Sequence, residues 1–184
     1  SNYKPLNLET ANVFGLELEF RKKLGTWFNN LANWNLNLNG SYIISDEKYS
    51  EDELKLIQLG LRDGQTLGDS RPLQGQSPYL INAGIEYNNS EKGIQGGLFY
   101  NVQGKTLQVV GDGFYPDVFT IPFNSLNFNL IKQFNVNRKL AFKITNLLND
   151  CRESRFEGFN NESQIFKSRN IGRQFSLSYT IGLK

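Results

Sequence analysis

Hydrophobic and polar residues alternate along several segments of this chain with few breaks. The clearest is Trp34–Tyr42, where a tryptophan, two leucines and a tyrosine alternate with three asparagines and a serine. A period of two places successive side chains on opposite faces of a β-strand. Each such segment therefore predicts a strand with one apolar face and one polar face.

Seven segments carry this pattern, and each is about ten residues long. They are Val13–Lys22, Asn33–Ser45, Tyr79–Tyr87, Ile94–Gln103, Asn124–Phe134, Lys139–Leu147 and Arg173–Leu183. A tilted strand needs about 9–11 residues to cross a bilayer, whereas strands of ordinary domains have a mode of about five or six. The lengths favour strands that span a membrane.

The connections between these segments alternate between long and short. The long ones are Asp46–Pro78, Gly104–Phe123 and Leu148–Gly172, and the shorter ones are Lys23–Ala32, Asn88–Gly93 and Asn135–Arg138. Outer-membrane barrels have short turns at the periplasmic end and long loops outside, so this rhythm predicts a barrel wall with all long loops at one end. Bacterial single-chain barrels have an even number of strands. Seven strands, the first descending from an external segment Ser1–Asn12, predict the last part of a larger barrel.

The first long connection also carries a helix signature. Ser50 and Glu53 form a possible capping box, and Leu54, Ile57 and Leu61 follow at roughly helical spacing. Two glycines, Gly60 and Gly64, predict an early end to this helix.

Composition excludes several classes of protein. Hydrophobic residues make up 39% of the 184 residues and aromatic residues 13%, a share too high for a disordered chain. No apolar run approaches the roughly 18 residues of a spanning helix. The net charge is +2 and the basic residues are scattered along the chain, so we expect no nucleic-acid partner. Histidine is absent and Cys151 is the single cysteine, which removes the commonest general base and metal ligand.

The remaining charged residues do not indicate an active site. Glu17, Glu19 and Arg21 share one strand face, which predicts a polar wall with Arg21 as the charge partner. Four loop carboxylates, Asp63, Asp69, Asp112 and Asp117, lack the register of a calcium loop and are expected to be solvated. Tyr79, Tyr87, Tyr100 and Tyr179 fit interfacial aromatic girdles. We therefore expect no catalytic residues, no cofactor, no metal and no enzyme activity.

Four stretches carry a family likeness. Val13–Phe20, Arg71–Gly84, Tyr100–Lys105 and Ile144–Asn149 resemble segments of the C-terminal barrel of TonB-dependent outer-membrane receptors, most closely those of Bacteroidetes-type bacteria. The likeness covers nearly the whole chain, and Arg71–Gly84 is its most specific part.

The resemblance implies a 22-stranded transmembrane β-barrel in the outer membrane of a Gram-negative bacterium, with a plug and a TonB-binding motif located before this chain. It implies active uptake of a nutrient powered by TonB, capture by the three long loops, and contact with outer-membrane lipid. It leaves open a surface lipoprotein as a further partner and assigns no ligand-binding residues. The family usually ends in an aromatic residue, whereas this sequence ends Gly-Leu-Lys184.

A second hypothesis gives the same periodicity. In a soluble β-barrel or sandwich that binds a small ligand or sugar, the apolar face would point into a core and the asparagines would meet water. The two hypotheses differ in the surroundings of Leu36, Leu126, Phe128 and Leu177. These side chains form an exposed belt in a membrane wall and pack together in a soluble core.

Overall fold

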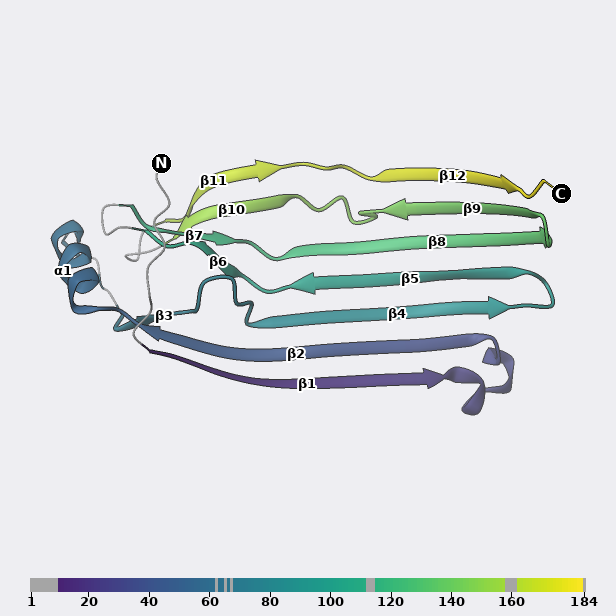
Figure 1. Ribbon diagram of the computed structural model, residues 1–184, viewed down its shortest axis with the longest axis horizontal. Helices are drawn as coiled ribbons and strands as arrows, with labels where there is room; N and C mark the ends of the chain where they lie inside the picture. The colour runs from purple at the N-terminus through teal and green to yellow at the C-terminus, as the bar shows by residue number, and fades with distance from the viewer. Residues whose placement is uncertain are drawn as a thin grey trace.

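Antiparallel β-sheet dominates the structure, a computed structural model that describes residues 10–61, 63–64, 66, 68–111, 115–157 and 162–183. Seven long strands follow one another in chain order, each beside its predecessor (Figure 1). They are β1 (Ala11–Lys23), β2 (Trp34–Lys48), β4 (Tyr79–Asn89), β5 (Ile94–Gln103), β8 (Phe123–Asn135), β9 (Arg138–Thr145) and β12 (Gln174–Ile181). All seven predicted strands are thus confirmed, with boundaries shifted by up to three residues.

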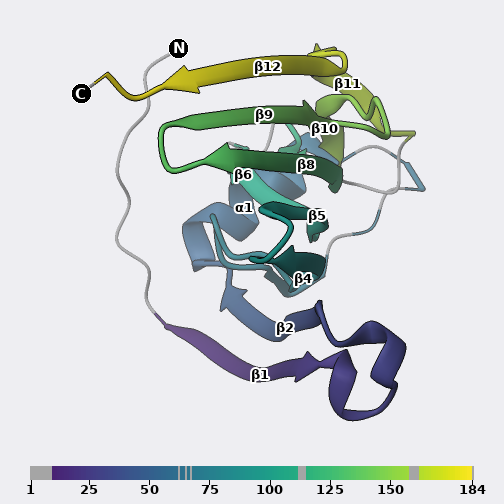
Figure 2. The same cartoon turned by 90° about the vertical axis from the view of Figure 1, so that its right-hand side faces the viewer.

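The large sheet is open and curved. Viewed along its strands, it follows an arc with β1 at one end and β12 at the other (Figure 2). The two ends do not pair with each other, so the described residues form no closed barrel. The long connections all lie at one end of this sheet, which we call the loop end, and the short ones at the other, the turn end (Figure 1).

The loop end contains more regular structure than the alternation predicts. Four strands form a second sheet in the order β11-β10-β7-β6: β6 (Thr106–Val109), β7 (Asp117–Thr120), β10 (Arg152–Glu157) and β11 (Gln164–Arg169). A two-residue strand, β3 (Ser70–Arg71), pairs with β2. The alternation predicts no strands in these long connections, because strands of two to six residues are too short to show a convincing period.

The described residues contain one α-helix, at the loop end, and two 3₁₀ turns, at the turn end. The helix α1 (Glu51–Gly60) ends at the predicted glycine, and Ser50 and Glu53 form the predicted capping box. The 3₁₀ turns η1 (Leu24–Thr26) and η2 (Asn29–Leu31) connect β1 to β2. Among the described residues, no helix has both the length and the apolar character needed to cross a membrane.

Side-chain hydrogen bonds link the polar face of the large sheet across four strands. Asn39 donates to Glu17 at 3.0 Å, Asn82 donates to Asn39 at 3.2 Å, and Asn101 donates to Asn82. Glu17 and the asparagines thus form a ladder from β1 through β2 and β4 to β5. On β1 the predicted ion pair between Arg21 and Glu19 is present.

The apolar face has no covering layer among the described residues. Leu177 is 71% exposed, and Leu36, Leu126 and Phe128 are half-buried. A hollow on this face has an entirely apolar lining, including Trp34, Ile85, Tyr87, Leu98, Phe128 and Leu130. In the part of the chain that the structure describes, few hydrophobic side chains are buried, and they lie near the loop end: Ile57, Val102, Leu107 and Val118. The four side chains whose surroundings distinguish the two hypotheses therefore do not pack together in a closed core.

A buried asparagine forms the corner between the two sheets. Asn146 is 4% exposed and adopts a φ of 54°, which ends β9 two residues before the predicted Leu147. Its amide donates to the carbonyl oxygens of Asp150 and Gly172 at 3.0 and 2.9 Å, and its oxygen accepts from the Asp150 amide at 3.0 Å. Its own backbone N–H donates to the side chain of Asn127 at 3.2 Å. Asn146 thus connects β8, β9, the start of β10 and the segment before β12.

The carboxylate of Asp150 completes this corner. It accepts hydrogen bonds from the backbone and side-chain nitrogens of Asn124 at 2.7 and 2.9 Å and from the Cys151 amide at 2.8 Å. The Asn124 backbone N–H is the main reason why the pKa of Asp150 lies below its ordinary value. These bonds attach the start of β10 to the loop end of β8.

Replacing Asn146 with alanine tests the importance of the corner. We expect Asn146→Ala to lower the free energy of unfolding by about 2–3 kcal/mol, because it leaves buried backbone groups without partners. Asn149→Ala is the matched control, since Asn149 also has a positive φ, 59°, but is exposed. Denaturant unfolding of the full-length protein in detergent measures both. Equal losses would show that the backbone conformation, and not the amide, stabilises the corner.

Candidate functional site

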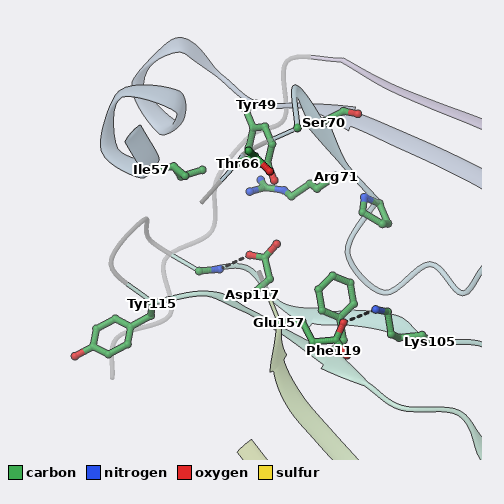
Figure 3. Close-up of a pocket in the computed structure, with 13 residues that line it drawn as sticks. Tyr49, Ile57, Thr66, Ser70, Arg71, Lys105, Tyr115, Asp117, Phe119 and Glu157 are labelled. Carbon is green, nitrogen blue, oxygen red and sulfur yellow. Dashed lines mark hydrogen bonds and ion pairs between the residues drawn. The ribbon is translucent and has the colours of Figure 1, made fainter. Parts of the chain in front are cut away.

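The three long connections meet around a cavity of about 270 Å³ at the loop end (Figure 3). The first connection contributes Tyr49, Ile57 and Arg71, among others, the second contributes Lys105 and Asp117, and the third contributes Glu157. Residues more than 100 positions apart in the sequence thus line one cavity. No individual ligand contact is predicted by the sequence, but all three loops predicted to capture a ligand reach this cavity.

A buried arginine lies at the centre of the site. The Arg71 side chain is 6% exposed, and its Nη2 donates to Glu47 at 2.9 Å and to Glu53 at 3.0 Å. The ring of Tyr49 packs against the guanidinium, with 5.1 Å between the ring centroid and Cζ of Arg71. Burial alone would lower the pKa of Arg71, but the bonds to Glu47 and Glu53 outweigh it and raise that pKa.

The start of α1 places Glu53 beside this arginine. Oε2 of Glu53 accepts from the backbone N–H of Ser50 at 3.0 Å, while its other oxygen, Oε1, accepts from Arg71. Burial alone would raise the pKa of Glu53, but the Ser50 N–H and the Arg71 guanidinium outweigh it and lower that pKa. The capping box therefore also orients one carboxylate of the site.

Asp117 lies across the cavity from Arg71 and points toward it (Figure 3). Its Oδ1 accepts from the Gly111 backbone N–H at 2.8 Å. Burial raises the pKa of Asp117, and the nearby Glu53 and Glu47 add to this effect, against the opposing influence of Gly111 and Arg71. Burial of the Tyr49 side chain raises the pKa of that tyrosine, and the negative charge of the nearby Asp117 raises it further.

The expectation that the loop carboxylates are solvated is thus wrong for Asp117. This residue lies in β7 and is half-buried, because the helix connection and β7 approach each other. Asp63 and Asp69 are exposed as predicted, and Asp112 lies outside the described residues.

A third ion pair lies on the opposite side of the cavity. Nζ of Lys105 contacts Oε2 of Glu157 and lies 4.7 Å from the ring of Phe119. Among the described residues, no group of three or more histidines, cysteines or carboxylates could hold a metal ion. Cys151 lies elsewhere, with its sulfur 3.2 Å from the Ser168 hydroxyl. The described lining of the cavity thus combines charged and aromatic side chains.

Comparison with known proteins gives no relative. No protein-family model matches the chain, and no curated protein or solved structure matches it either.

The opposite pKa shifts in the site predict stability effects of opposite sign. Because the pKa of Glu53 is lowered on folding, Glu53→Gln should destabilise the protein at pH 7, with the loss fading as the pH falls through the folded pKa. Because the pKa of Asp117 is raised on folding, Asp117→Asn should stabilise the protein at pH 7. That gain should vanish below about pH 3.9, the ordinary pKa of the group. Thermal unfolding between pH 3 and 8 measures both, with the exposed Asp69→Asn as control.

Removing the buried cation should be far more damaging than removing an exposed one. Arg71→Met leaves Glu47, 2% exposed, without its partner, so we expect a loss of about 3–5 kcal/mol. Lys55→Met is the matched control, since Lys55 pairs with Asp52 across an exposed surface and should cost less than about 1 kcal/mol. Hydrogen exchange of the α1 amides reports the local effect. Similar protection in the two variants would rule out Arg71 as the centre of the loop end.

Proposed function

We propose that this chain forms part of the barrel wall of a TonB-dependent active transporter in the outer membrane of a Gram-negative bacterium. Its apolar face contacts lipid, its polar face lines a wet lumen, and its loop end faces the outside. The protein takes up a nutrient and is not an enzyme. The observation that carries this proposal is the continuous apolar face of long strands with no covering layer among the described residues.

The positions of aromatic residues support the placement of the apolar face in a membrane. Tyr42 pairs with Tyr79 at the loop end, and Trp34 pairs with Tyr87 near the turn end. The two pairs are separated by about 26 Å along the strand, comparable with the roughly 25 Å apolar band between the aromatic girdles of outer-membrane barrels. The rings of Trp34 and Tyr87 also touch edge to face, with centroids 5.2 Å apart.

The open edges support a larger wall. β1 and β12 each pair on one side only, and unpaired backbone groups are costly in hydrocarbon. In the proposed barrel of 22 strands, further strands cover both edges. The involvement of TonB, a plug and a nutrient rests on the resemblance of segments such as Arg71–Gly84 to the receptor family.

The soluble alternative has less support. It requires a second apolar layer against the large sheet, and α1 and the second sheet lie at the loop end instead (Figure 1). Burial of hydrophobic side chains contributes about 25 cal/mol per Å². A soluble protein of this shape would forgo that stabilisation over most of its apolar surface.

Adjacent positions on β12 test the face assignment. We expect Leu177→Arg to impair membrane insertion by about 2–4 kcal/mol, because it places a charge in lipid near the middle of a strand. Ser178→Arg, at the same depth on the polar face, should insert normally. Detergent-extracted, heat-modifiable protein in outer-membrane fractions measures insertion. If Ser178→Arg is the variant that fails, the two faces are inverted.

Energised uptake requires a separate experiment. A strain without this protein and a strain without TonB should fail to remove the same solute from a mixed-nutrient medium, measured by mass spectrometry of the spent medium. Depletion of that solute by the TonB-deficient strain would exclude TonB-dependent transport by this protein.

A further inference from the structure

A second cavity, a groove of about 480 Å³, lies between the ends of the large-sheet strands and the second sheet. Asn101 and Gln103 of β5 form one side of it, and both alternate with the apolar Tyr100 and Val102. The groove is therefore continuous with the polar face of the large sheet. Its opposite side consists of β10 and β11.

Three cations on β10 and β11 line this groove: Arg152, Lys167 and Arg169. Arg152 lies directly opposite Arg169 in the antiparallel register, and Lys167 lies opposite Ser154, two residues along the same face. Like charges at directly opposite positions are destabilising, because their Cβ atoms are only about 4.5–5.5 Å apart. The three cations are thus concentrated on one face of one hairpin.

Protein carboxylates do not neutralise this cluster in the part of the chain that the structure describes. None of the ion pairs among those residues involves Arg152, Lys167 or Arg169. Glu153 lies at the groove, but its Oε1 accepts from Nε of Arg155 at 2.6 Å. Arg152 contacts the ring of Phe123 at 4.7 Å, which holds the guanidinium in place and leaves its charge uncompensated.

Neutral hydrogen-bonding groups complete the lining. Oε1 of Gln108 accepts from the hydroxyls of Ser154 at 2.8 Å and Thr120 at 3.2 Å. The buried Thr106 accepts from Gln103 at 3.5 Å. These bonds hold Gln103, Thr106, Gln108, Thr120 and Ser154, which we call the floor of the groove, in fixed positions beside the three cations. Guanidinium groups bind carboxylate, sulfate and phosphate oxygens with paired hydrogen bonds.

We propose that this groove binds the anionic group of the transported ligand, a carboxylate, sulfate or phosphate. The inference rests on the proposed function, because it places the groove at the outer mouth of the lumen. The cation cluster selects anionic solutes there, and the amides and hydroxyls on the floor hold the neutral part of the solute. An anion that binds between Arg152 and Arg169 relieves the repulsion between these two cations.

The test uses citrate as the anionic probe and glucose as the neutral one, titrated into the full-length protein in non-ionic detergent at constant ionic strength. We expect citrate to bind to the protein and glucose to show no comparable binding. In Arg152→Gln/Arg169→Gln the dissociation constant for citrate should rise about tenfold or more, because the charge-assisted hydrogen bonds are lost. Arg138→Gln/Lys139→Gln removes two exposed cations at the turn end and should leave citrate binding unchanged. Absence of citrate binding, or equal weakening in both double variants, overturns the proposal.

The single variant Arg169→Gln separates binding from folding. Without an anion at low salt, this variant should unfold at a higher temperature than the unmodified protein, because the repulsion with Arg152 is gone. With citrate the order should reverse. A lower unfolding temperature in both conditions overturns the proposal. Anion binding in detergent does not require TonB or membrane insertion. If the anion effect is absent while Leu177→Arg impairs insertion and Ser178→Arg does not, this inference fails and the proposed function stands.

Discussion

The whole structure depends on the division of one sheet into two faces of opposite polarity. The period of two places leucine and aromatic side chains on one face, and a ladder from Glu17 to Asn101 forms on the other. No layer of the described chain covers the apolar face, and many of its large hydrophobic side chains are exposed. In the membrane wall that we propose, lipid covers this face and the loop end meets the ligand.

Buried polar interactions organise the loop end, beside the small group of buried hydrophobic side chains there. Asn146 joins the two sheets through its amide, and Arg71 joins β2, β3 and α1 through two carboxylates. Loss of a partner from buried polar groups of this kind is costly. They therefore fix one arrangement of the three long connections, and this arrangement creates both the Arg71 cavity and the cationic groove on the other side of the second sheet.

Much of the fold could be predicted from the sequence, because long strands with one buried or lipid-facing side carry a strong period. The capping box at Ser50 likewise marks the helix start. The second sheet could not be predicted, since β6 and β7 have four residues each and the Arg152–Glu157 strand is rich in charge. The cavity around Arg71 could not be predicted from the sequence either. Arg71 lies in the stretch that most resembles the receptor family, but its partners Glu47 and Glu53 and the facing Asp117 are brought close by tertiary contacts between connections. The cation cluster depends on the register between β10 and β11, which sequence spacing does not specify.

The central claim, that the two faces of the large sheet meet lipid and water, is tested most directly by spin-label accessibility along β8. In a Cys151→Ser background of the full-length protein in bilayers, single cysteines replace six consecutive residues and carry a nitroxide. The positions are Ser125, Leu126, Asn127, Phe128, Asn129 and Leu130. The account predicts a period of two, with collisions of lipid-soluble oxygen high at the even positions and those of a water-soluble nickel complex high at the odd ones. Even positions shielded from both reagents would show a closed protein core and contradict the membrane wall.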